Sequence, residues 1–308
     1  MIILIIVIII IFVTSSVLCR ISIGFVAYLC ACLFPSFCEK NHKFEMFELL
    51  QSDAHSCARK GLLHTKKGSI QTPEFMPVGT RASVKSLDNR ELLECGTQII
   101  LANAYHLALR PGMEIIQKAG GLHRFMNWDL PILSDSGGFQ VFSLARIRKV
   151  QSDGVAFRSH LDGSAFFLGP KESMSIQRKI ASDIAMTFDE CPPHDESFEA
   201  IQSAVLRTID WAAICKDQPR GLHQQLFGIV QGGKYADLRM HCARQLVEMD
   251  FDGYAIGGVS VGESEAEMMT AVEQTEMHLP KDKPRYAMGL GTPRQIVELV
   301  ARGMNSGV

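Results

Sequence analysis

Seven short apolar runs alternate with helical patterns along most of the chain, and this alternation restricts the possible folds more than any other feature. The runs occupy residues 75–80, 98–103, 131–135, 184–189, 226–231, 253–257 and 285–289. Several lack polar alternation, which is typical of buried strands in a parallel sheet. Helical patterns occupy residues 171–182, 197–216, 237–249, 263–278 and 293–302. Residues 155–168 indicate a hairpin that turns at Asp162 and Gly163.

This order predicts an α/β fold, a (β/α)8 TIM barrel that lacks its eighth strand. A closed barrel needs eight strands, and the chain reads VARGMNSGV over residues 300–308, where the eighth would begin. We expect such an open barrel to expose two strand edges and part of its core. A doubly wound open sheet is the second choice, because no glycine-rich phosphate motif follows the first run.

The first 38 residues differ from the rest in composition. Residues 1–19 carry no charge and are long enough to span a bilayer, Arg20 interrupts the run, and residues 21–38 are again uncharged. A membrane anchor, a non-native upstream extension and a cleaved signal all stay open as interpretations. We therefore divide the chain into a hydrophobic leader, residues 1–38, and an incomplete barrel domain, residues 39–308.

Composition and charge narrow the class of protein. Hydrophobic residues make up 47% and charged residues 21%, so the chain can bury a core and is not intrinsically disordered. The net charge of -2 argues against a generally basic nucleic-acid binder, although it permits a local basic patch. Neither the histidines nor the cysteines beyond Cys38 have the spacing of metal ligands, so no metal site is predicted.

Polar residues and glycines end the apolar runs, and in α/β folds the carboxyl ends of the strands carry the active site. Asp135 can act as an acid or a base, and Asp189 can accept two hydrogen bonds from adjacent donors such as the N1–H and 2-amino groups of guanine. Gln231 can donate to a carbonyl, and Gly258 offers free backbone N–H and C=O groups. Roles as turn or cap residues explain each of them equally well.

Three further residues lie close to these strand ends in the sequence. Phe139 and Met288 can sandwich an aromatic base, and Cys191 can line the same pocket. Packing in a hydrophobic core is the alternative for all three, and the sequence leaves it open.

Eight motifs occur in one order. They are TPEFMPVGT (72–80), NAYHL (103–107), SDSGGFQVFSL (134–144), SHLDGS (159–164), FDEC (188–191), GIVQGG (228–233), AIGGVSVGE (255–263) and MGLGTP (288–293). Together they resemble the tRNA-guanine transglycosylases, also called queuine tRNA-ribosyltransferases. The resemblance extends from about residue 44 to residue 303.

The resemblance implies a TIM barrel with a zinc-binding insertion and a cytoplasmic pentosyltransferase of queuosine tRNA modification. Such enzymes exchange guanine at the wobble position of the tRNA anticodon for a 7-deazaguanine, either queuine or its 7-aminomethyl precursor. An aspartate attacks the ribose C1′ and forms a covalent glycosyl-enzyme, which the incoming base then displaces. The implied partners are the anticodon loop of tRNA, a 7-deazaguanine base and, by the family's habit, a second subunit in a dimer.

The resemblance also assigns roles to residues that approach the edge of the base. Asp135 corresponds to the general acid/base that handles the proton of the base. Asp189 corresponds to the reader of the N1–H and 2-amino edge, while Gln231 and the Gly258 backbone correspond to the contacts with O6.

Other matched positions correspond to the walls of the site. Phe139 takes the place of the aromatic residue that stacks on the base, and Met288 lies on the other side. The Val259 carbonyl would face the substituent at C7. Cys191 and Val261 resemble the bacterial branch, which inserts 7-aminomethyl-7-deazaguanine rather than queuine.

The chain departs from the family where the nucleophile and the zinc ligands are expected. In the family the eighth strand carries the nucleophilic aspartate in a Phe-Asp-Cys-like motif, and three cysteines and one histidine that bind zinc follow it. Here no aspartate follows Asp282. Three hypotheses result: an active transglycosylase completed by a partner chain, a catalytically inactive base-binding or interaction protein with membrane contact through residues 1–38, and a truncated product with a spurious leader.

Overall fold

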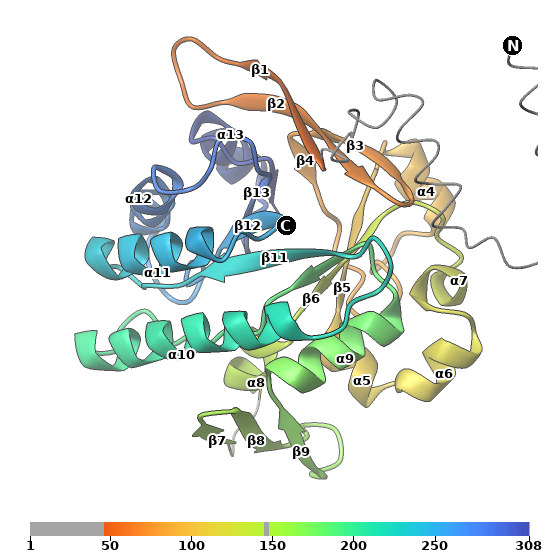
Figure 1. Ribbon diagram of the computed structural model, residues 1–308. Coiled ribbons are helices and arrows are strands. Elements are labelled where there is room, and N and C mark those ends of the chain that lie inside the picture. Colours follow the sequence, from red (N-terminus) through yellow and green to blue (C-terminus); the bar gives the residue numbers. More distant parts are fainter. Residues whose placement is uncertain (1–45, 145–147, 308) are drawn as a thin grey trace, which may run out of the picture. The chain divides into compact units, whose positions relative to one another are not determined.

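A computed structural model describes residues 46–144 and 148–307 of the chain (Figure 1). The leader predicted at residues 1–38 lies outside the described residues, as does its boundary with the barrel domain, so this division of the chain stays a prediction. Met46–Val308 forms one compact unit. No helix in the two described ranges is both long enough and apolar enough to cross a bilayer.

The centre of this unit is an eight-stranded parallel sheet. Its spatial order is β4-β14-β13-β12-β11-β10-β6-β5. The strands are β4 (Glu74–Phe75), β5 (Ile100–Asn103), β6 (Ile132–Asp135), β10 (Ile184–Met186), β11 (Gln225–Val230), β12 (Gly253–Ile256), β13 (Arg285–Ala287) and β14 (Ser306–Gly307). Six of the seven apolar runs are confirmed as strands, and the seventh, residues 75–80, shares only Phe75 with β4.

A short bridge joins β4 and β5, the two strands at the ends of this spatial order. Val78, just beyond β4, pairs with Leu101 of β5 in parallel. The Gly79 N–H donates to the Leu101 carbonyl at 2.7 Å, and the Leu101 N–H donates to the Pro77 carbonyl at 3.0 Å. The sheet therefore curls back on itself as a barrel, which confirms the predicted fold class and rules out the open sheet that was the second choice.

The expectation of a lacking eighth strand is wrong. Ser306 pairs with Tyr286 and Glu74, and Gly307 pairs with Ala287 and Phe75. This two-residue β14 therefore pairs on both sides, and the two strand edges that were expected to be open are covered by hydrogen bonds. Asn-Ser-Gly contains no apolar residue, so the pattern that identifies the other strands could not identify this one.

Helices follow most barrel strands and lie outside them (Figure 1). They are α4 (Asn89–Glu94), α5 (Ala104–Leu109), α6 (Met113–Lys118), α7 (Leu122–Met126), α8 (Gly138–Leu144), α9 (Pro170–Ile180), α10 (Phe198–Asp217), α11 (Ala236–Glu248), α12 (Glu265–Glu276) and α13 (Pro293–Ala301). The five predicted helices are confirmed to within two residues at each end. The side chains of Ser197, Ser264 and Thr292 cap α10, α12 and α13 by accepting a backbone N–H, which explains where these helices begin.

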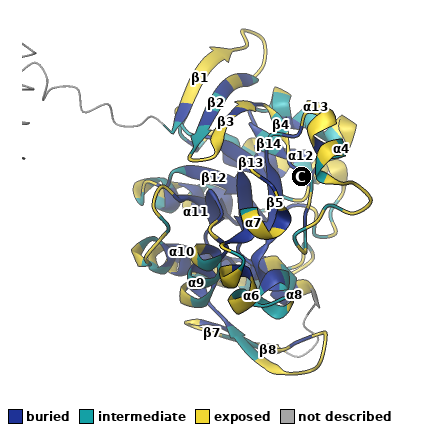
Figure 2. Ribbon diagram, turned by 90° about the vertical axis from the view of Figure 1, so that its right-hand side faces the viewer, coloured by how far each residue is buried: buried dark blue, intermediate teal, exposed yellow. Residues whose placement is uncertain are grey.

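Two antiparallel sheets flank the barrel. One contains β7 (Arg148–Gln151), β8 (Gly154–Arg158) and β9 (Ala165–Leu168), of which β8 and β9 form the predicted hairpin. The other contains β1 (Phe47–Ser52), β2 (Arg59–Thr65) and β3 (Gly68–Thr72), which the sequence did not predict. Its inner residues Phe47, Leu63 and Ile70 share a hydrophobic cluster with residues of the barrel strands, such as Leu133, Ile184 and Phe227. Figure 2 shows the barrel strands as the most deeply buried part of the fold.

Arg59 ties this β1–β3 sheet to the barrel. Its side chain is 6% exposed. It donates to the carbonyls of Lys281 at 2.7 Å and Gly303 at 3.2 Å, and also to the Asn305 side chain. Replacing Arg59 with methionine is expected to lower the free energy of unfolding by roughly 1–3 kcal/mol, because buried acceptors lose their donors. Urea unfolding measures the effect, with the exposed neighbour changed in Lys60→Met as the control. Equal stability of both variants would contradict this role for Arg59.

Candidate functional site

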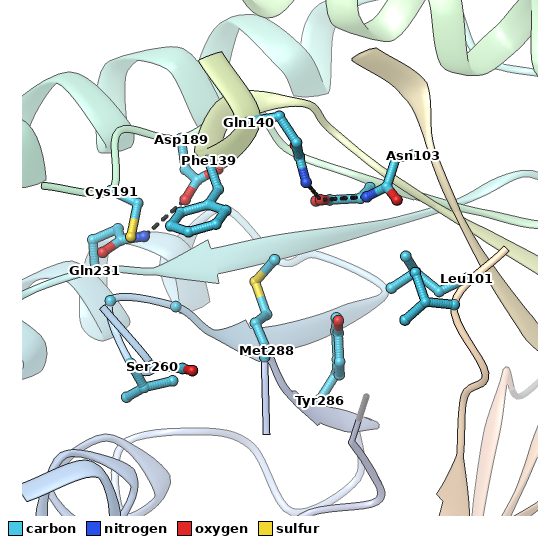
Figure 3. A pocket seen from close by; sticks show the side chains of 16 residues that line it. Leu101, Asn103, Phe139, Gln140, Asp189, Cys191, Gln231, Ser260, Tyr286 and Met288 are labelled. Carbon is cyan, nitrogen blue, oxygen red and sulfur yellow. Dashed lines mark hydrogen bonds between the residues drawn. The ribbon is translucent and has the colours of Figure 1, made fainter. Parts of the chain in front are cut away.

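A cavity of about 210 Å³ opens at the carboxyl ends of the barrel strands (Figure 3). One ordered water needs only about 10–15 Å³, so the space is large enough for an organic ligand. Eight of the residues that the sequence singled out line it, namely Asp135, Phe139, Asp189, Cys191, Gln231, Gly258, Val259 and Met288, whereas Val261 is not among its lining residues. The structure thus brings together residues that are up to 153 positions apart (288 − 135) in the sequence.

The barrel explains this convergence. Asp135 is the last residue of β6, Gln231 directly follows β11, and Gly258 and Met288 follow β12 and β13 closely. Asp189 comes three residues after β10. Parallel strands that close into a barrel place all their carboxyl ends on one face, so the residues that follow them meet there.

Asp135 is held by three hydrogen bonds on one side of the cavity. Its Oδ2 accepts from Gln140 Nε2 at 2.8 Å and from Asn103 Nδ2 at 3.3 Å, and its Oδ1 accepts from the Ser136 N–H at 2.9 Å. Burial raises the pKa of this carboxyl group, and the three donors partly oppose that change. The carboxyl group therefore has a fixed orientation and a raised affinity for a proton.

Asp189 lies on the other side of the cavity (Figure 3). Its Oδ2 accepts from Gln231 Nε2 at 2.7 Å, and its Oδ1 accepts from Ser136 Oγ at 3.4 Å. Burial, together with the negative charge of Asp135, raises the pKa of Asp189 to about 7. Near neutral pH, Asp189 is therefore present in both its protonated and its ionised form.

Gln231 has an unused acceptor. While its Nε2 donates to Asp189, its Oε1 is buried without a hydrogen-bond partner in the described part of the protein. A buried amide oxygen without a partner is costly, so Oε1 is stabilised by a hydrogen-bond donor from a ligand or an ordered water, and it cannot itself pair with a carbonyl oxygen.

The walls of the cavity are apolar. The Phe139 ring, from α8, is 42% exposed, and the Met288 side chain approaches from the end of β13 (Figure 3). A flat aromatic ligand would be stabilised by contact with a ring face and with a polarisable thioether. Cys191 is buried, which raises the pKa of its thiol to about 12, so this residue is a neutral wall of the site at neutral pH.

Gly258 requires the absence of a side chain. Its φ is +62°, and a Cβ atom here would lie 2.5 Å from Gln231 Oε1. Only glycine adopts this conformation readily while leaving the cavity open next to the amide of Gln231.

Other residues line the cavity that the sequence did not assign to the site, among them Gln140, Tyr286 and Leu101. Asn103 was noticed only as the end of a strand. In the structure Asn103 is directly opposite Asp135 in the β5–β6 register, which is why it reaches that carboxylate. Tyr286 belongs to β13, and its burial raises its pKa well above the ordinary value, as does the charge of Asp135. Of these residues, Gln140 is the one that the sequence could have indicated, because it is polar and follows Asp135 by five residues.

The described residues contain no group of three or more histidine, cysteine, aspartate or glutamate side chains that could hold a metal ion. The cysteines in the described ranges, including Cys191, Cys215 and Cys242, are free thiols. The polar residues that line the cavity, among them Asp135, Asp189 and Gln231, supply acid–base and hydrogen-bonding groups.

Comparison with known proteins agrees with this geometry. A family model described as queuine tRNA-ribosyltransferase matches residues 53–305. Proteins named queuine tRNA-ribosyltransferase from Staphylococcus aureus strains JH9, JH1 and Mu3 are each 53% identical to this chain over 260 residues. The matched region covers 84% of this chain and 69% of each relative. The chain therefore belongs to the family of queuine tRNA-ribosyltransferases, the pentosyltransferases also known as tRNA-guanine transglycosylases.

Proposed function

We propose that the cavity binds guanine and 7-deazaguanine bases during the exchange of the wobble guanine of a tRNA anticodon. The observation that carries this proposal is the arrangement of Asp189, Gln231 and Gly258 along one side of a cavity with apolar walls. An ionised Asp189 accepts from the N1–H and 2-amino groups. The second hydrogen of Gln231 Nε2, whose first hydrogen bonds Asp189, donates to O6 together with the Gly258 N–H. No other common base carries this order of donors and acceptors.

Two side chains complete the contact with the base. The ring of Phe139 stacks on one face of the base, and Met288 packs against the other. The Val259 carbonyl accepts a hydrogen bond from the substituent at C7. Cys191 lines the cavity, and its match with the bacterial branch favours the 7-aminomethyl precursor over queuine.

Asp135 is the residue that we assign to proton transfer. It lies in the same cavity, its orientation is fixed by Asn103 and Gln140, and burial raises its pKa. A carboxyl group with a raised pKa can give a proton to the departing guanine and take one from the incoming base.

The relatives are named after tRNA, and we infer the same partner here. A base within a stacked strand cannot reach the bottom of a cavity, so the wobble nucleotide has to leave the stack of the anticodon loop. We place the reaction in the cytoplasm with the family, and a dimer is a proposal on the same basis. Zinc binding is a property of the family. The described residues contain no group of three or more side chains that could hold the ion, and no proposed step uses it.

Competition binding tests the proposal. We expect guanine and 7-aminomethyl-7-deazaguanine to compete for one site, and adenine not to compete, because its 6-amino group and unprotonated N1 reverse the required donors and acceptors. Incorporation of labelled guanine into tRNA then separates a transglycosylase from a protein that only binds the base. The shared name of the relatives favours the transglycosylase.

Gly138 offers a test that leaves every contact with the base chemically intact. A Cβ atom at this position would lie 2.5 Å from the Asp189 carbonyl oxygen and 2.8 Å from its Oδ1. Gly138→Ala should therefore displace Asp189 and weaken guanine binding by roughly 10- to 100-fold, since small displacements of binding groups have large effects. The matched control is Gly221→Ala, where the nearest atom, Gln224 Cβ, lies at an ordinary 3.5 Å. Equal guanine affinity of both variants would contradict the proposed position of Asp189.

A further inference from the structure

A fully buried arginine lies behind the two glycine turns of the site. Arg239, in the first turn of α11, has 0% exposure. Its Nε donates to the Gly233 carbonyl at 2.6 Å, its Nη1 to the Gly257 carbonyl at 3.1 Å, and its Nη2 to the Gly258 carbonyl at 2.9 Å. One guanidinium group therefore holds the turn after β11 and the turn after β12 together.

Among the described residues, no aspartate or glutamate forms an ion pair with this cation. Burial lowers the pKa of Arg239 to about 10, and the charge of Glu263 is among the effects that oppose this change. In the described part of the chain, Arg239 Nη1 also donates a longer hydrogen bond to Thr275 Oγ1 at 3.4 Å. A buried cation is costly unless it is fully hydrogen-bonded, so the site depends on carbonyl oxygens that point at Arg239.

The direction of those carbonyls fixes the direction of the neighbouring N–H groups. In a trans peptide the C=O and N–H bonds point in opposite directions. Because the Gly257 carbonyl points at Arg239, the N–H of Gly258 points away from it, and the same reasoning applies to the Gly258 carbonyl and the N–H of Val259. Gly257, Gly258 and Val259 all line the cavity.

We propose that Arg239 is a positioning residue that makes the Gly257–Gly258–Val259 turn present N–H donors to the base, and thereby selects a 6-oxo purine over a 6-amino purine. This inference rests on the proposed function, in which O6 of the base lies at Gly258. A carbonyl oxygen at C6 accepts from such donors. An amino group at the same position brings hydrogen atoms against them and leaves a buried donor unsatisfied.

A purely structural role for Arg239 is the alternative. It predicts that any change at Arg239 weakens all ligands by the same factor, because the whole cavity loosens. The positioning role predicts that the preference for the 6-oxo group is lost first. The ratio of two dissociation constants distinguishes the alternatives, and it is insensitive to the fraction of folded protein.

The experiment measures the affinity of the full chain for guanine and for 2,6-diaminopurine at pH 8. These bases share the 2-amino group and differ at N1 and C6. Asp189 contributes the same preference for N1–H in every variant, so the change in the ratio between variants isolates the turn. For the unsubstituted chain we expect guanine to bind at least ~100-fold more tightly, since a site that hydrogen-bonds a polar group rejects analogues strongly.

In Arg239→Gln we expect this ratio to fall by roughly tenfold or more, because the two peptide groups are free to turn. Arg239→Lys keeps the positive charge without the planar fork, so its ratio should lie in between. Arg244→Gln is the matched control, since Arg244 is an exposed arginine on the same helix, and its ratio should not change.

Arg239→Gln is destabilising. If this variant does not fold, a milder substitution at Thr275 keeps the test decisive. Thr275→Val removes the hydroxyl that accepts from Arg239 Nη1 and leaves the turns untouched, so a fall in the ratio of about two- to threefold is expected. An unchanged ratio in the folded variants overturns the proposal. If the unsubstituted chain binds neither base, the proposed function itself fails, and that result differs from a ratio that is merely unaffected by Arg239.

Discussion

Replacing Asp189 with asparagine is expected to weaken the binding of guanine by roughly 100-fold or more at pH 8. The loss combines a charge-assisted pair of hydrogen bonds with an amide N–H that would face the N1–H of the base. Calorimetric or fluorescence titration measures the change. Asp195→Asn, which removes an exposed carboxylate in the same segment, is the control and should bind guanine normally.

The pH dependence of the unsubstituted chain gives a second measure of Asp189. Its pKa is raised to about 7, and the base binds to its ionised form, so the affinity should increase as the pH rises to about 7 and then level off. In Asp189→Asn this dependence should disappear. A variant that binds guanine as tightly as the unsubstituted chain would contradict the assignment of Asp189.

Asp189→Asn, which weakens guanine binding, is expected to reduce the loss of folding stability as the pH rises. The folded-state pKa of Asp189 lies above its ordinary value, so ionisation of this carboxyl group opposes folding as the pH rises through that range. Asparagine carries no such charge. Urea unfolding should therefore show a smaller loss of stability between pH 5 and pH 8 in the variant than in the unsubstituted chain.

Asp135→Asn is expected to have opposite effects on exchange and on binding. The sequence has no aspartate after Asp282 to hold the ribosyl group, so exchange is measured with a partner chain that supplies this nucleophile. There, loss of the acid/base should slow the incorporation of guanine into tRNA by roughly 10²–10⁴-fold. The charge of Asp135 raises the pKa of Asp189, so its removal should lower the midpoint of the pH dependence of guanine binding below 7. At pH 6 the variant should therefore bind guanine more tightly than the unsubstituted chain.

This pair of effects distinguishes proton transfer from base recognition. If Asp135 contributed mainly to holding the base, the affinity for guanine at pH 6 would fall in Asp135→Asn. Exchange at an unchanged rate would contradict the assignment of Asp135 as the acid/base. The binding measurement does not depend on turnover, so it tests the coupling of the two carboxyl groups independently.

Much of the barrel was predictable because each strand carries its own local signal. The run at residues 226–231 is apolar and short, and it forms a strand buried along its whole length, β11. The β1 strand had no such signal, since only Phe47 of its six residues is buried. The pairing of β1 with β2, and the packing of this sheet against the barrel, depend on tertiary contacts that a local sequence pattern does not predict.

The site was predictable to the extent that strand ends identify it. Asp135, Asp189 and Gln231 converge because parallel strands end on one face, and this rule needs no coordinates. The hydrogen bond from Asn103 to Asp135 depends on the register of two strands 32 positions apart. The role of Arg239 depends on where a helix places its first turn. Local spacing in the sequence indicates neither strand register nor helix placement, so neither feature could be predicted.

The most direct test of the central claim is a titration of the chain with 7-aminomethyl-7-deazaguanine at pH 6 and pH 8. Recognition by Asp189 with a pKa of about 7 predicts a single site whose affinity is about tenfold higher at pH 8 than at pH 6. Absence of binding, or an affinity that is the same at both pH values in the unsubstituted chain, would contradict the account of this cavity as a reader of the guanine edge.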